Sequence, residues 1–133
     1  MKLVLSLACE DARQRPDGRL DFVGVFDELQ APGFPAAQDR MTVVFIMEWA
    51  PEQRGRHEFR ADLVDSEQRK VLTIEGHTDV APEGGRPRTQ LLMPLERVIF
   101  PHEGEYRFVL TVGDATVPAF SLFVSEAAES GSP

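Results

Sequence analysis

The hydrophobic and polar positions of this chain alternate with a period of two, most clearly near the C-terminal end. From Tyr106 to Val112 every second residue is aromatic or aliphatic, and most of the residues between them are polar. This period predicts a strand with one buried face. Gly113-Asp114 is typical turn sequence, and the apolar segment Val117–Val124 predicts the returning strand of a hairpin.

Similar segments recur along the rest of the chain, separated by turn residues. Arg40–Trp49 is apolar at odd and even positions alike, which predicts a central strand covered on both faces. Gly24 interrupts an apolar face, which predicts a bulge or the close approach of another backbone. Pro94 predicts an edge strand or a bulge, and the long interval Gly76–Arg88 predicts a loop. The remaining predicted strands are Leu3–Cys9, Arg19–Leu29, His57–Leu63, Lys70–Glu75 and Thr89–Leu95.

These segments predict an all-β fold, specifically an antiparallel immunoglobulin-like β-sandwich of about eight strands. No segment has a convincing helical period, so a parallel sheet would lack the crossover helices it needs. Tyr106 follows Gly104 at the start of its strand, which is where such sandwiches often place a structural tyrosine corner. We expect one domain over residues 1–124 and a flexible tail over residues 125–133.

Four short motifs resemble an uncharacterised family of small bacterial immunoglobulin-like domains. They are the Cys-Glu-Asp-Ala-Arg start at Cys9–Arg13, Gly-Val-Phe at Gly24–Phe26, the loop Ala31–Pro35, and Gly-Glu-Tyr at Gly104–Tyr106. The resemblance covers most of residues 1–124 and implies the sandwich fold in a single-domain cytoplasmic protein. It implies no activity, substrate or cofactor. The family pattern suggests Asp-Gly at the last hairpin turn, whereas this chain has Gly113-Asp114, which leaves the turn type open.

Charge and composition narrow the classes of partner that this chain is expected to bind. The net charge of −8 disfavours a nucleic-acid partner, because phosphate binding needs a basic face. No apolar run approaches the length of a membrane span. Met1–Cys9 superficially imitates a lipoprotein leader, but its short apolar region alternates as a strand does. A single cysteine excludes an intrachain disulfide and suits a reducing compartment, so we expect a cytoplasmic protein without a membrane partner.

The residues with candidate chemistry do not form a recognisable catalytic pattern. Cys9 is followed by two carboxylates that would raise the pKa of its thiol, so we expect a buried structural thiol. His57, His77 and His102 lie far apart in the sequence, without metal-ligand spacing. We therefore predict no catalytic residue, cofactor or metal. Whether the protein is an enzyme stays open, with a non-catalytic protein favoured.

The prediction for function is a non-catalytic binding or scaffold module that acts through protein–protein contact or self-association. The candidate contact surface is Phe34 and Pro35 in the apolar loop, together with the strand edge at Pro94. Phe34 either covers one end of the sandwich, which we favour, or anchors a partner. Edge pairing of two copies would give a homodimer. The alternatives are a small-molecule pocket near Phe34, Trp49 and His77, or an enzyme with a non-local site.

Overall fold

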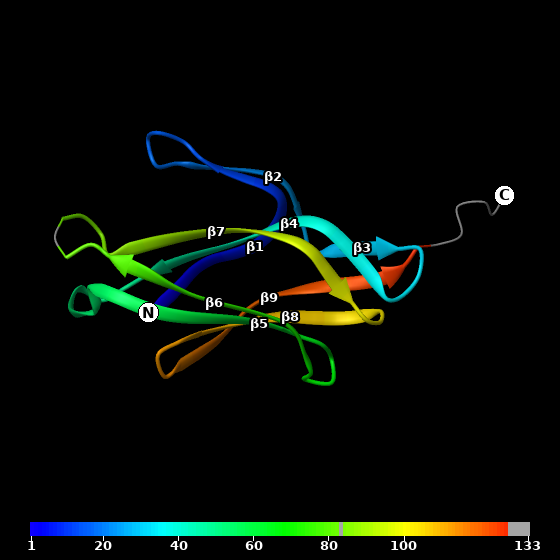
Figure 1. The fold of residues 1–133 in the computed structure, drawn as a ribbon. Helices are drawn as coiled ribbons and strands as arrows, with labels where there is room; N and C mark the ends of the chain where they lie inside the picture. Colours follow the sequence, from blue (N-terminus) through cyan, green and yellow to red (C-terminus); the bar gives the residue numbers. More distant parts are fainter. Residues whose placement is uncertain (83, 128–133) are drawn as a thin grey trace.

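The computed structural model describes residues 1–82 and 84–127, and nearly all regular structure in them is β (Figure 1). The predicted all-β class is therefore confirmed. The strands form two sheets that lie over one another as two layers. The elements are β1 (Lys2–Gln14), β2 (Leu20–Phe26), β3 (Glu28–Ala31), β4 (Ala36–Glu48), the 3-10 helix η1 (Pro51–Gln53), β5 (Gly55–Val64), β6 (Lys70–Val80), β7 (Arg88–Phe100), β8 (Gly104–Val112) and β9 (Ala115–Glu126).

The strand order is β2-β1-β4-β7 in one sheet and β3-β9-β8-β5-β6 in the other. The predicted segment Arg19–Leu29 is divided at Asp27, because the chain leaves the first sheet after Phe26 and enters the second at Glu28. This division gives nine strands in the described residues where about eight were predicted. It also gives one exception to antiparallel pairing, since β3 arrives beside β9 running in the same direction.

Strand β1 contains an irregularity that the alternation in sequence does not reveal. Its register against β4 shifts between Leu3 and Leu5, as a β-bulge does. Leu3 therefore pairs with Met47, a residue of the core between the sheets, whereas Leu5 pairs with Ile46, which belongs to a second cluster. The apolar side chains of this strand therefore do not all lie on one side: Leu3 packs against the main core, and Leu7 packs against the second cluster.

The main core lies between the two sheets, with β4 at its centre. Every residue from Met41 to Met47 is buried, as predicted for a strand covered on both faces. The ring of Phe45 packs edge-on against Phe108 and is tilted against Phe120, which joins the two layers. These contacts exclude water from the middle of the sandwich, and burial of their apolar surface stabilises the fold.

A second, smaller core lies on the other face of the four-stranded sheet. Cys9, Val44 and Ile46 are its buried members. Strand β1 runs on past Cys9 to pair with β2, and this hairpin stands above the upper layer in Figure 1. Its Leu20 and Phe22, with Leu7, Ala12 and Leu92, pack against the buried members. The Gln14 side chain at the hairpin's end donates a hydrogen bond to Gln90 Oε1 of β7, so the hairpin reaches back across the sheet.

Two further segments differ from the expectation. Residues 76–80 extend β6 instead of forming a loop, because Thr78 and Val80 continue the inward alternation and are buried. In the predicted tail 125–133, Ser125 and Glu126 end β9, and residues 128–133 lie outside the described residues. The described part of the chain contains no helix with the length and apolar character that a membrane crossing needs.

Candidate binding surface

The predicted contact residues lie in two separate places. Phe34 is half-buried and packs against the main core, in the loop that joins β3 to β4, while Pro35 beside it is exposed. Pro94 is exposed on β7, which is an edge strand of the four-stranded sheet, and it pairs with Thr42 of β4. The structure therefore places Phe34 over one end of the sandwich and does not bring it together with Pro94.

Cys9 is fully buried in the core beneath the β1–β2 hairpin, and its Sγ contacts the main-chain oxygen of Thr42 at 3.7 Å. Burial raises the pKa of the Cys9 thiol, and the negative charge of Asp11 raises it further. A thiol with a raised pKa and no access to solvent is a poor nucleophile.

The three histidines lie in three different environments. His57 stacks on Trp49 with ring centroids 4.2 Å apart. His77 projects from the exposed face of β6, and His102 contacts Asp65 in the turn between β5 and β6. Among residues 1–82 and 84–127, no three His, Cys, Asp or Glu side chains gather as metal ligands.

The pocket suggested near Phe34, Trp49 and His77 is not formed. Phe34 precedes the start of β4, where Ala36 pairs with Phe100, whereas Trp49 follows the other end of the same strand. His77 pairs with Glu58, on a face that points away from the core. Phe34 and Trp49 therefore lie beyond opposite ends of β4, and His77 lies on the outer face of the five-stranded sheet.

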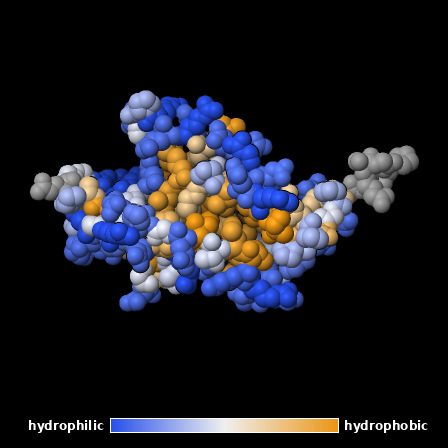
Figure 2. Space-filling model, viewed as in Figure 1, coloured by the Kyte–Doolittle hydropathy of each residue, from blue (hydrophilic) through white to orange (hydrophobic). Residues whose placement is uncertain are grey.

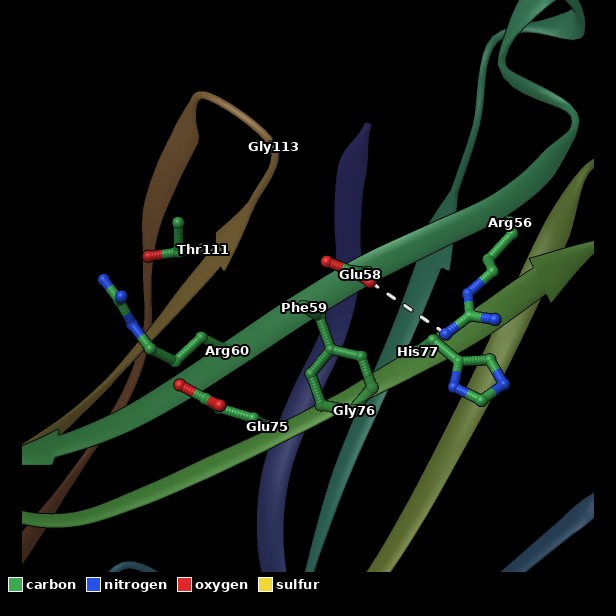
Figure 3. Close-up of a pocket in the computed structure, with 9 residues that line it drawn as sticks. All are labelled: Arg56, Glu58, Phe59, Arg60, Glu75, Gly76, His77, Thr111 and Gly113. Carbon is green, nitrogen blue, oxygen red and sulfur yellow. Dashed lines mark ion pairs between the residues drawn. The ribbon is translucent and has the colours of Figure 1, made fainter.

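A polar groove of about 530 Å³ lies on the five-stranded sheet (Figure 3). Arg56 and Arg60 face Glu58 and Glu75 there, and Arg56 pairs with Glu58 at 3.9 Å. Two positive and two negative side chains balance one another, so the groove offers no strong preference for an anion or a cation. Exposed ion pairs of this kind are ordinary on a sheet surface.

A different surface, mostly apolar, follows the edges of β1 and β9. One groove of about 470 Å³ lies between the end of β2 and β9, and a second of about 410 Å³ lies between the start of β1 and β9. The Ser6 hydroxyl lines both and donates a 2.8 Å hydrogen bond to the Ala119 carbonyl. We call this surface the open flank; its residues are Met1–Ala8, Val25–Asp27, Val117–Ala119, Phe120, Ser121 and Phe123.

The open flank concentrates the exposed apolar side chains of the molecule. Six large apolar side chains are exposed among the described residues, and four of them line the two grooves. These four are Val4 at 41% exposed, Leu5 at 37%, Val25 at 57% and Phe123 at 47%. A cluster of this kind on an otherwise charged protein is typical of a contact surface.

Outside the open flank, apolar side chains are also visible between the two layers, near the edge strands β6 and β7. Figure 2 shows them gathered in the middle of the face turned to the viewer, with hydrophilic residues above and below. Edge strands β6 and β7 carry half-buried side chains that pack on the main core, namely Val71, Leu72, Ile74, Leu91, Met93 and Leu95. On β7, however, Pro94 lacks an N–H and Arg97 has a positive φ of 58°, features that hinder the addition of a strand.

The open flank also includes incompletely paired strands. Residues 2–7 of β1 pair with β4 alone, because β2 covers only Ala8–Gln14. Along β9, β3 covers only residues 123–126, so the earlier part of β9 pairs with β8 alone. Within the described ranges no further strand pairs with these edges, and the Ser6 hydroxyl occupies the Ala119 carbonyl of β9. Unpaired N–H and C=O groups on an edge are a template for another strand.

The sequence indicated this surface only weakly. Val25 and Phe123 lie at alternate positions that a half-buried strand normally fills with polar residues. These two apolar residues are the only indication of the open flank that the sequence contains. The crossing of β2 and β3 between the sheets determines which edges stay open, and that crossing depends on pairing with β9, far away in the sequence.

Comparison with known proteins gives one match. A family of unknown function (DUF6941) matches residues 4–125, and the chain belongs to this family. Searches of curated proteins and of solved structures return no match. The match agrees with the expected membership of an uncharacterised family, and it carries no activity with it.

Proposed function

We propose that this protein is a non-catalytic binding module with an immunoglobulin-like fold, and that it binds other proteins through the open flank. The observation that carries the proposal is the coincidence of exposed apolar side chains with unpaired strand edges along β1 and β9. Apolar side chains supply affinity, and an unpaired edge supplies directional hydrogen bonds to an extended segment.

Three features support the immunoglobulin-like assignment. An antiparallel sheet of four strands and a mostly antiparallel sheet of five lie face to face, and the first part of the chain contributes to both. The short parallel pair β3–β9 closes one side of the second sheet. Tyr106 lies near the start of the last hairpin and bonds back to the main chain of His102, as a tyrosine corner does. A lone buried cysteine suits a cytoplasmic location, which we include in the proposal.

Site-specific photo-crosslinking tests the proposal. A photoreactive amino acid at Val4 should form covalent adducts with protein in cells, whereas the same group at Ile99, an exposed apolar position outside the open flank, should not. The substitution Leu5→Asp should suppress the adducts at Val4, because a charge would then lie on the contact surface. Equal adducts from Val4 and Ile99, or none from either in folded protein, would contradict the proposal. Recovery of a small molecule alone would favour a ligand-binding function.

A further inference from the structure

The open flank is complementary to itself, and we propose that its occupant is the open flank of a second copy of this chain. The inference rests on the proposed function and names the partner. Three observations carry it: the direction of the free edge of β1, the charges at its two ends, and the apolar side chains between them.

The direction follows from the way β2 pairs with β1. Strand β2 runs antiparallel to β1 and ends at Phe26, which pairs with Ala8. A further antiparallel strand in line with β2 would pair with residues 2–7 and extend the four-stranded sheet. Two β1 strands related by a two-fold axis run antiparallel, so β1 of a second copy has the required direction.

The charges at the ends of the free edge are opposite. Lys2 lines the groove at the start of β1, and Asp27 lines the groove where β2 ends. In the antiparallel arrangement the start of β1 in one copy follows the end of β2 in the other, so Lys2 of one copy faces Asp27 of its partner. The two-fold axis repeats the pair at the opposite end, and both ends are complementary.

Apolar side chains lie between the charged ends. Val4 and Leu5 are exposed near the centre of the edge, where the two-fold axis would pass. The segment contains no proline or glycine, whereas β7 is interrupted by Pro94 and β9 by Pro118. Of the free edges of β1, β7 and β9, only that of β1 lacks a proline, and the bulge between Leu3 and Leu5 limits main-chain pairing with a second copy to the residues on either side of it.

Long-range electrostatics opposes the association. Each chain carries a net charge of −8, so two copies repel one another at low ionic strength. At about 0.15 M salt the screening length falls to about 8 Å, which weakens this repulsion more than a direct contact between Lys2 and Asp27. We therefore expect dimerisation to be favoured by moderate salt.

Charge reversal across the two-fold axis tests the arrangement. In sedimentation experiments at tens of micromolar protein, the wild type should be a dimer. Lys2→Glu alone and Asp27→Lys alone should each weaken the dimer by tenfold or more, because each places like charges at both ends. An equimolar mixture of these two variants should form a heterodimer, and the double variant should dimerise again. Arg88→Glu and Asp79→Lys, which change the charge equally away from the open flank, are the controls.

The outcomes separate this inference from the proposed function. A wild type that stays monomeric at all concentrations overturns self-association, while protein adducts at Val4 would still support binding of a different partner. A dimer that resists both reversals, or that the mixture fails to restore, overturns the antiparallel alignment. Circular dichroism of each variant shows whether the fold persists. If the Lys2 and Asp27 variants unfold, Leu5→Asp provides the test, and an unchanged dimer in that variant excludes the open flank.

Discussion

The hydroxyl of Tyr106 donates a hydrogen bond of 2.5 Å to the main-chain carbonyl of His102, and the two rings stack with centroids 5.6 Å apart. The main-chain N–H of His102 donates to the same hydroxyl at 3.2 Å. One side chain therefore satisfies both main-chain groups of a loop residue. The His102 ring also contacts Asp65 at 3.2 Å, so the loop between β7 and β8 is joined to the turn between β5 and β6.

Removal of the Tyr106 hydroxyl should destabilise the protein. Tyr106→Phe keeps the buried ring but leaves main-chain groups of His102 without their partner, which costs about 1–3 kcal/mol in the free energy of unfolding. Urea titration measures this cost. Thr111→Val, which removes an exposed hydroxyl from the same strand, should change stability by less than about 0.5 kcal/mol. Equal effects of the two substitutions would show that the Tyr106 contact contributes little.

The pair formed by His102 and Asp65 should make stability depend on pH in two windows. The hydrogen bond to the Glu103 carbonyl, and then that to the Asp65 carboxylate, raise the pKa of His102. The contribution of protonated His102 to stability is therefore complete below the pKa of histidine in the unfolded chain, about 6.5, and is lost as pH rises through the raised pKa of the folded protein. The main-chain N–H of Arg69 is the first cause that lowers the pKa of Asp65 to about 2. The contribution of the Asp65 carboxylate to stability is present above about pH 4 and is lost as pH falls towards 2.

His102→Gln should remove the upper of these windows. The urea midpoint of the wild type should fall relative to that of the variant between pH 6 and pH 8, because glutamine does not titrate. His57 and His77 are present in both proteins, so the difference between the two curves isolates His102. Parallel curves over this range would show that the contact does not couple protonation to folding.

The thiol of Cys9 should react only when the β1–β2 hairpin opens. Phe22 packs on the small core that contains Cys9, whereas its neighbour Val23 points outward and is exposed. Phe22→Ala should therefore accelerate the reaction of folded protein with a thiol reagent by about tenfold or more, since less apolar surface holds the hairpin closed. Val23→Ala should leave the rate unchanged. Rapid modification of the wild type at neutral pH would show that Cys9 is accessible without opening.

Gly76 should not tolerate a side chain while Phe59 is present. A methyl group at this position would lie 2.9 Å from Cζ of Phe59, whose ring covers the glycine (Figure 3). Gly76→Ala should cost about 1–3 kcal/mol, because the buried ring must move. Phe59→Leu costs stability by itself, but in that background the added cost of Gly76→Ala should be smaller. Additive effects in the double-mutant cycle would contradict the contact.

The fold class was accessible from sequence because it depends on local patterns. The alternation from Tyr106 to Val112 and the two-sided apolar segment Arg40–Trp49 correspond to β8 and to most of β4. The alternation of polar and apolar residues within a single strand is enough to indicate which of its faces is exposed to solvent. The bulge after Leu3 was not predictable, because an extra residue leaves the apolar composition unchanged and shifts only the register.

The candidate site was harder to predict from the sequence, because it depends on pairing between distant segments. Asp27 looks like an ordinary polar residue inside a longer strand, and only the pairing of Glu28 with Phe123 shows that the chain changes sheets there. Phe34 is an unusual aromatic residue for a loop, and in the structure it packs against the main core. The residues that line the open flank have no motif in common, so their proximity follows from topology alone.

The parallel pairing of β3 with β9 has a consequence for synthesis of the chain. Residues 28–31 can take their places only beside residues 123–126, so the five-stranded sheet stays incomplete until residues 123–126 have left the ribosome. Contacts this distant in sequence form slowly and leave apolar strand edges exposed in the meantime. The nascent chain should therefore need chaperone protection until β9 emerges, and loss of this last strand should release β3 and leave both sheets prone to aggregation.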